Sequence, residues 1–571
     1  MSRSSQEQSL PSLGTAGTTA VKEKHDLEKT VAVDVQEGVI IEDGLRRALK
    51  GKHVSLISLA SVIGASCFYG FGNALSEAGP VGALIGFGIV GFMVWALMQS
   101  IGEVTTMFPI AGGFIEHATR FVDPAFSFSM AWMYYFMWSV FLASELNGAI
   151  MIVQYWVPEE KFPFWGWILV FWIFFSFLTT LGVHIYGELE FYLGWFKICA
   201  LALCFFLSLL YNVGAFGTGY IGFRYWGAPY GKEAKPHDRC EPASVDLNVI
   251  GPILNGIEGF GRVFVLASAY YVGTEIISLA AGETKDPRRS IPQVSSTSTA
   301  RPGVNTVVYR ILFVYMGLIF FQGIICPSNS PELLTGNSNT ASSPFTIAFT
   351  AGGWTWSADF INAIIVVAFI SAVNGCIYVQ SRALYALALS GRAPKVFAIT
   401  SKKGVPYVST LTSCLWGFLA LMNLKVTAGQ VFTYMTSVGG SAAYIAWAGI
   451  ILTHLRVRSG MERQGLADRA SYPFRALGSI WIYRFNLFLN VFILFIQGFT
   501  ALESPFDWRS FVASYIMIPT AVVFFVGYKW YHNTRWVRLS EMDFSDRLVK
   551  EESEEEKKET RVARFVNRFR N

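Results

Sequence analysis

Long apolar stretches alternate with short polar connections along most of this sequence. A helix needs about 20 predominantly apolar residues to cross the hydrocarbon core of a bilayer. Stretches of this length predict about twelve transmembrane helices, and therefore an all-α polytopic membrane protein. The predicted spans are Val54–Leu75, Val81–Phe108, Ala125–Trp156, Phe164–Val183, Phe191–Gly214, Phe260–Gly282, Val304–Ile325, Phe360–Ser390, Tyr407–Leu424, Gln430–Leu455, Tyr483–Leu502 and Val512–Trp530.

Composition supports a surface that faces lipid. Of the 571 residues, 53% are apolar and only 15% are charged, whereas a soluble chain is about a quarter charged. A charge at the bilayer centre costs about 2.5–3.5 kcal/mol, so charges gather in the connections. The net charge of +5 reflects these basic loops. We therefore expect the lipid bilayer as a partner and no nucleic acid.

The basic loops also predict the orientation. Lys and Arg accumulate in short loops on the cytosolic side of membrane proteins. Alternate connections carry this charge, and an even number of spans places them all on one side, together with both termini. We expect the N and C termini in the cytosol. The basic groups are Arg46–Lys52, Arg120, Lys285–Arg289, Arg392–Lys403 and Arg456–Arg475.

Two predicted spans contain residues that interrupt a helix. Small residues and glycines run from Ser61 to Gly72 in the first span, and Gly273 stands beside Glu275 in the sixth. A glycine costs about 1 kcal/mol in a helix interior, so both runs can unwind. Two breaks five spans apart are typical of inverted-repeat transporters, whose site lies where the broken helices meet. The alternative is close helix packing through small residues.

Ionisable residues inside apolar spans are the other candidates for function, because they are costly to bury in a membrane. Glu145, Lys197 and Glu275 lie within spans, and Glu103 lies near the cytosolic end of its span. Each has an alternative. Lys197 could extend to the interface, and both Glu145 and Glu275 could be paired scaffold residues. We expect Glu103 to be structural.

Motifs spread over the membrane region resemble those of the fungal (yeast-type) amino acid permeases of the amino acid–polyamine–organocation superfamily. The resemblance extends from about Gly44 to Tyr531, with the motifs in family order. They are Gly44–Lys50 with His53, Glu77–Pro80, Gly102–Pro109, Gly112–Phe114, Thr119–Ala125, Gln154–Trp156, Gly273–Glu275 with Ala281–Glu283, Asp286–Pro292 and Ser381–Ala388.

The resemblance implies a fold of five plus five helices, related as an inverted repeat of the leucine-transporter type and followed by two peripheral helices. It divides the chain as follows: 1–52, cytosolic N-terminal tail; 53–215, first repeat; 216–258, extracellular loop; 259–455, second repeat; 456–482, cytosolic loop; 483–531, peripheral helices; 532–571, cytosolic C-terminal tail.

The resemblance also implies proton-coupled import of L-amino acids at the plasma membrane. The substrate carboxylate would meet the first break, and its amino group would meet carbonyls of the sixth span. Lys197 would replace a sodium ion as a proton-sensitive group, and Glu145 would handle substrate or protons. Glu275, a candidate because it lies inside a span, is also expected to take part in proton coupling. The implied substrate-binding residues are Ile63, Gly64, Ala65, Ser66, Glu145, Ala269, Tyr270, Tyr271, Val272 and Gly273.

Two departures from the family pattern fall on the implied site. The family usually has Gly-Thr-Gly in the first span, whereas this chain has Gly64-Ala65-Ser66. The sixth span usually has an aromatic residue before a small one, whereas here Ala269 precedes Tyr270. The particular substrate therefore stays open.

Other functions compete with amino acid transport. A permease-like amino acid sensor is one alternative. Transport of a polyamine or related organic cation is another, with tyrosines and Glu145 supplying cation–π and charge contacts. We find no phosphate loop, metal cluster or nucleophile–base pair, and His117, His184 and His237 resemble loop residues. We thus expect no enzyme, metal or cofactor, with the proton gradient as driving force.

Two further features concern the segments outside the membrane. Cys240 and Cys326 both fall on the predicted exterior, where they form a disulfide or remain separate thiols. Lys22, Lys24 and Lys29 of the N-terminal tail are candidate ubiquitin acceptors, which implies ubiquitin ligase adaptors as partners, although a solvated lysine cluster needs no such role.

Overall fold

The computed structural model of the chain describes most of the membrane region. The described residues are 41–42, 45–46, 64, 68, 70–227, 255–280, 304–333 and 343–544, except 109, 111, 182, 218, 331–332, 402–403, 425–427, 467–471, 473 and 503–504.

Within these residues the fold is helical, apart from two short antiparallel strands, β1 (Ile41–Glu42) and β2 (Leu45–Arg46). The helices before residue 300 are α3 (Phe71–Met107), α4 (Phe114–Phe121), α5 (Pro124–Val153), α6 (Phe164–Thr180), α7 (Val183–Asn212), α8 (Gly256–Tyr271) and α9 (Ile276–Ala280). Those after it are α11 (Val304–Ile325), α13 (Pro344–Ala351), α14 (Ser357–Leu389), α15 (Tyr407–Leu415), α16 (Ala428–Arg463), α17 (Ile480–Ile496), α18 (Trp508–Tyr515) and α19 (Met517–His532). Short 3-10 helices cover Arg224–Trp226, Lys395–Ala398, Trp416–Leu424 and Phe499–Leu502.

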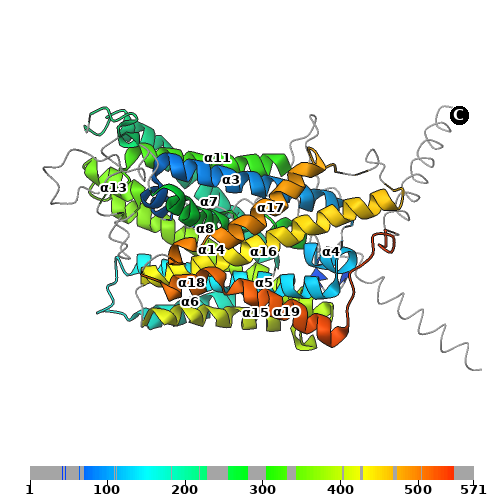
Figure 1. Cartoon of the computed structure of the whole chain (residues 1–571). Helices are drawn as coiled ribbons and strands as arrows, with labels where there is room; N and C mark the ends of the chain where they lie inside the picture. The colour runs from blue at the N-terminus through cyan, green and yellow to red at the C-terminus, as the bar shows by residue number, and fades with distance from the viewer. Residues whose placement is uncertain are drawn as a thin grey trace, which may run out of the picture.

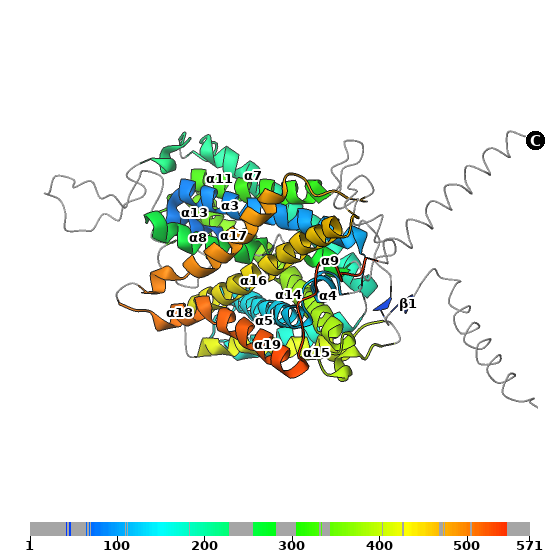
Figure 2. The same ribbon diagram turned by 45° about the vertical axis from the view of Figure 1, so that its right-hand side comes forward.

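The long helices lie side by side, with α4 near one end of the bundle and α13 near the other (Figures 1 and 2). Within the described part of the chain, five helices are long and apolar enough to cross a membrane. Counting the pair α18 and α19, which is bent by 42°, as one span gives six, and four shorter apolar helices accompany them. Large apolar side chains face outward, such as Phe177 and Val523 at 67% and 66% exposure. This arrangement suits lipid and confirms a polytopic membrane protein.

Helix α5 forms the centre of the bundle, where it packs against α14 and α16, while α3 packs against α8 and α11. Its sequence explains its position, because both apolar and small residues recur on all sides of the helix. Asp123 caps its first turn by accepting a hydrogen bond from the Ala125 amide at 2.7 Å.

Several span boundaries differ from the predictions. The end of the first predicted span and the second span merge into α3, with a break at Gly79, whose φ of 70° favours glycine. Helix α7 begins eight residues before the predicted Phe191, and α16 runs eight residues past the predicted Leu455. Helices α4 and α13 were not predicted, because helices of eight residues lack the long apolar run that marks a span.

His117 was expected in a loop, and that expectation was wrong. It lies buried within α4, where its Nε2 atom donates a hydrogen bond to the Phe108 carbonyl oxygen at 2.6 Å. Burial, with a smaller contribution from the nearby Arg120 charge, outweighs the opposing Phe108 hydrogen bond and lowers the pKa of His117 from its ordinary 6.5 to about 4.

We expect His117→Gln to flatten the acid dependence of stability. Below a pH of about 6.5 the unfolded chain binds a proton that the folded chain refuses until about pH 4. The folded state therefore loses up to about 1.4 kcal/mol for each pH unit in this window. Glutamine retains a donor for Phe108 but does not titrate. Melting temperatures of the purified protein across this window test the prediction, and an unchanged slope in the variant would contradict it.

Candidate functional site

The sixth predicted span is interrupted, as its glycine suggested. Helix α8 ends at Tyr271, a turn covers 272–275, and α9 begins at Ile276. Gly273 has a φ of 109°, a conformation that favours glycine. Both carboxylate oxygens of Glu275 accept from the Gly273 amide at 3.2 Å, and Oε1 also accepts from the Tyr134 hydroxyl at 3.2 Å. Glu275 thus closes the turn, and its predicted part in proton coupling stays a prediction.

The first predicted span is also non-helical at Gly64, Phe68 and Gly70, its described residues before α3. Gly64 lies outside any helix, and α3 begins only at Phe71. The Tyr270 hydroxyl lies where a side chain on Gly70 would begin, 1.9 Å from an ideal Cβ. The two interrupted spans therefore meet at this point. Ile63, Ala65 and Ser66 are outside the described residues, so their predicted role is not addressed by the structure.

The two neighbouring tyrosines of α8 point in different directions. Tyr271 packs toward α3, where its hydroxyl donates to the Phe87 carbonyl oxygen at 3.2 Å. Tyr270 lies against Phe71 at a ring distance of 5.4 Å and lines the cavity described below. The Tyr270 carbonyl oxygen accepts from the Tyr315 hydroxyl at 2.6 Å, so one of its lone pairs is already used. Of the two tyrosines predicted to bind substrate, only Tyr270 reaches the cavity.

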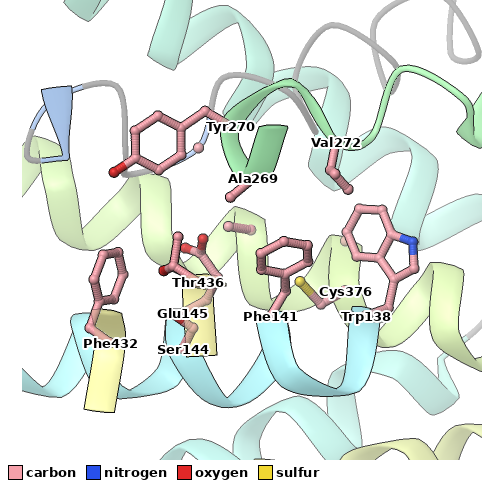
Figure 3. Close-up of a pocket in the computed structure, with 13 residues that line it drawn as sticks. Trp138, Phe141, Ser144, Glu145, Ala269, Tyr270, Val272, Cys376, Phe432 and Thr436 are labelled. Atoms are coloured by element: carbon pink, nitrogen blue, oxygen red, sulfur yellow. The ribbon is translucent and has the colours of Figure 1, made fainter. Parts of the chain in front are cut away.

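A cavity of about 50 Å³ lies between the two interrupted spans and helices α5, α14 and α16 (Figure 3). This measure corresponds to a few water molecules, since each needs roughly 10–15 Å³. Five of the predicted substrate-binding residues line the cavity: Gly64, Glu145, Ala269, Tyr270 and Val272. The other lining residues are Trp138, Phe141, Ser144, Ala372, Gly375, Cys376, Phe432 and Thr436.

Glu145 is the acidic side chain in this lining. Figure 3 shows it beside Thr436, between the rings of Phe141 and Phe432 and across from Ala269. Its Oε2 atom is buried and has no hydrogen-bond partner among the described residues. A buried, unsatisfied carboxylate oxygen is costly, so this atom is available for a cation or an N–H donor of a ligand.

Lys197 lies behind the cavity wall rather than in it. It is fully buried in α7, and its Nζ atom donates to the Ser371 hydroxyl at 2.8 Å. Ser371 donates in turn to Glu190 Oε2 at 2.8 Å, and Asn374 donates to Glu190 Oε1 at 3.3 Å. Ser371 and Asn374 belong to α14, on which Ala372 and Cys376 line the cavity. Lys197 is therefore hydrogen-bonded to the helix that lines the cavity. Its side chain does not extend to the membrane interface.

Sequence reasoning missed the contributions of α14 and α16. Ser371, Cys376 and Thr436 carry no charge, lie in apolar spans and match no motif used above. One pattern could have indicated the contribution of α14: Ser371 and Asn374 are three residues apart, which places two polar side chains on the same helix face. The choice between a Cys240–Cys326 disulfide and two separate thiols stays open, because Cys240 is outside the described residues.

Helices broken near the middle of a membrane bundle, around a cavity with one buried carboxylate, define a multi-pass membrane transporter. The family model described as "Amino acid permease" matches residues 53–541. The chain belongs to the amino acid permease family, whose members are transporters rather than enzymes, as the sequence analysis expected.

Curated relatives align with most of this chain, and the alignments cover most of each relative as well. An uncharacterised amino-acid permease of Schizosaccharomyces pombe is 35% identical over 518 residues, covering 91% of this chain and 89% of the relative. The general amino acid permease AGP3 of Saccharomyces cerevisiae is 35% identical, covering 87% and 84%. The lysine-specific permease LysP of Lactococcus lactis is 32% identical, covering 88% and 94%.

We expect a small thiol reagent to inhibit uptake through Cys376, because this side chain lines the cavity. Its modification would fill the small space and remove most uptake, and excess substrate should protect it. Uptake by Cys376→Ala, measured after treatment with a methanethiosulfonate, should be resistant. Cys204→Ala is the matched control, since Cys204 is buried elsewhere in α7. Equal inhibition of the Cys376 variant would remove this residue from the substrate path.

Proposed function

We propose that this permease imports L-amino acids across the plasma membrane by alternating access, coupled to entry of protons. The observation that carries the proposal is the unsatisfied Glu145 carboxylate in a cavity between two interrupted helices. Free backbone groups at such breaks suit the carboxylate and amino groups that every amino acid carries. Gly64 of the first predicted span and Ala269 of the sixth both line this cavity.

The second part of the proposal is that Lys197 carries the coupling. A lysine that gives up its proton inside the membrane would change its bond to Ser371, and Ser371 lies on the helix that lines the cavity. Glu190 is joined to the same serine and can take part in the exchange. The state of this Lys197–Ser371–Glu190 chain would then favour one side of the alternating-access cycle over the other.

The orientation belongs to the same proposal. Both termini lie in the cytosol on the basis of the Lys and Arg bias. The end of the bundle with Arg120 and Arg456 would face the cytosol, and the end with α13 would face outward. Ubiquitin ligase adaptors acting on the N-terminal lysines remain a prediction, because those lysines are outside the described residues.

A second candidate is transport of a polyamine or related organic cation. Glu145 lies among the aromatic rings of Trp138, Phe141 and Phe432, and a carboxylate surrounded by aromatic faces binds cations well. The printed names of the relatives, a general amino acid permease and a lysine-specific permease among them, favour amino acids over this second candidate and leave the particular amino acid open.

Uptake of radiolabelled compounds by a permease-deficient yeast expressing the chain tests both candidates. Amino acids and polyamines would be compared at acidic and neutral pH, with Glu145→Gln as the site variant. We expect saturable amino acid import that a protonophore abolishes and that the variant loses. Import of polyamines alone would favour the second candidate. Specific binding by purified, reconstituted protein without flux would indicate a sensor and contradict both.

A further inference from the structure

A groove of about 410 Å³ lies on the outer surface of the bundle and shares no lining residue with the cavity. It is formed by the N-terminal part of α5, the end of α14 and the last turns of α19. Figure 2 shows α19 and α15, which follows α14, at the same side of the molecule. The lining consists of Phe128, Gly391, Arg392, Val523, Phe524, Gly527, Tyr528, Tyr531 and His532.

The two ends of this groove differ in chemistry. Arg392 follows the end of α14 and His532 is the last residue of α19, so both lie where helices leave the membrane. Val523 and Phe524 lie about nine residues earlier in α19, which is roughly 13 Å deeper along the helix axis. The groove thus joins a polar, basic end to an apolar end, as a phospholipid does.

Arg392 is placed to bind an anion. Its side chain is only 6% exposed, and its Nη1 atom donates to Ser127 at 3.1 Å and lies 3.7 Å from a Glu116 oxygen. Both contacts are made by the same terminal nitrogen. The ion pair with Glu116 offsets part of the positive charge, while Nε and Nη2 donate no hydrogen bond to the described residues. The remaining N–H donors of this planar group suit phosphate oxygens. Lys395 adds exposed positive charge three residues further along.

The apolar end is open rather than filled. An added side chain on Gly527 would meet no atom within 4 Å. The wall behind this space is built from stacked rings, with Phe128 and Tyr528 at 4.4 Å and Phe128 and Phe524 at 5.8 Å. Val523 is 66% exposed beside them. A flexible acyl chain can fill such a space along a membrane helix.

We propose that this groove binds an anionic phospholipid, with the headgroup at Arg392 and His532 and an acyl chain along Val523, Phe524 and Gly527. Basic pockets between membrane helices at a cytosolic surface bind such headgroups. The orientation proposed above places this end in the cytosolic leaflet, where anionic lipids concentrate. Binding itself goes beyond the transport activity and does not require it.

Native mass spectrometry of the purified full chain tests the proposal by titration with phosphatidylserine, phosphatidylcholine and ergosterol. We expect phosphatidylserine to be retained most strongly. Arg392→Gln should weaken it about fivefold, the effect of one basic group near an anionic lipid. Gly527→Leu should reduce retention of both phospholipids because it fills the acyl path. Val522→Leu is the matched control, since Val522 lies on the opposite face of α19 and should change nothing.

Three results would overturn the proposal: equal retention of the two phospholipids, preferential retention of ergosterol, or unchanged retention in Gly527→Leu. Melting temperatures measured without added lipid establish that each variant is folded. Because Gly527→Leu retains every charged group, it tests the groove even where Arg392→Gln destabilises the contact with Glu116. Uptake measured on the same variants is separate, so failure of the transport proposal would leave the lipid result intact.

Discussion

Lys197→Met should abolish pH-stimulated, uphill accumulation of substrate while leaving substrate binding measurable. Methionine has nearly the same length and apolar stem, but it carries no proton and cannot donate to Ser371, which now accepts from Lys197 at 2.8 Å. A hydrogen bond to a charged group contributes about 1.5–3 kcal/mol, enough to shift a two-state equilibrium by one to two orders of magnitude. Uptake by energised cells or proteoliposomes across a range of external pH is the measurement.

Two comparisons separate this effect from simple damage to the protein. Lys161→Met replaces an exposed lysine in the connection between α5 and α6 and should leave accumulation unchanged. Ser371→Ala should weaken the pH dependence without abolishing it, because the lysine itself remains. Uphill, pH-dependent accumulation by Lys197→Met would exclude Lys197 from coupling, even if downhill exchange were also affected.

The scaffold of this protein was largely predictable because lipid imposes a simple rule on the sequence. Each span must be long and apolar, so α11 at Val304–Ile325 was predicted to the residue. The errors concern features that the length of an apolar run does not determine. The break at Gly79 barely shortens the apolar run in which it lies, and the short helix α4 lies outside the apolar runs. Backbone breaks and helices at the membrane surface depend on tertiary contacts, which apolar length does not encode.

The site was predictable only in part, for a related reason. Charged residues are conspicuous inside a membrane span, and Glu145 and Lys197 were singled out for that reason. Their environments differ, however: Glu145 faces the cavity, and Lys197 lies behind Ser371. Glu275 proved to cap the turn at Gly273. The direction in which a side chain faces depends on how its helix is rotated in the bundle. A uniformly apolar helix has no polar face in its sequence from which this rotation could be predicted.

Glu103→Gln should be among the most destabilising single changes in the bundle. The fully buried carboxylate accepts two hydrogen bonds from the Arg458 guanidinium, at 2.6 and 2.8 Å. It also accepts from the Ala476 amide at 2.7 Å and lies 3.0 Å from His454 Nε2. These contacts join α3 to α16 and to the segment before α17. Removing the negative charge leaves Arg458 buried without compensation, which costs about 3–5 kcal/mol.

Thermal unfolding of the detergent-purified protein measures this cost, and surface expression reports it in cells. Glu77→Gln provides the matched control: its ion pair with Arg262 at 2.7 Å is partly exposed on both sides and is worth at most about 1 kcal/mol. Glu103→Leu combined with Arg458→Met should recover part of the loss, because no buried charge then remains unpaired. Equal stability of the Glu103 and Glu77 variants would mean that the network around Glu103 does not hold the three segments together.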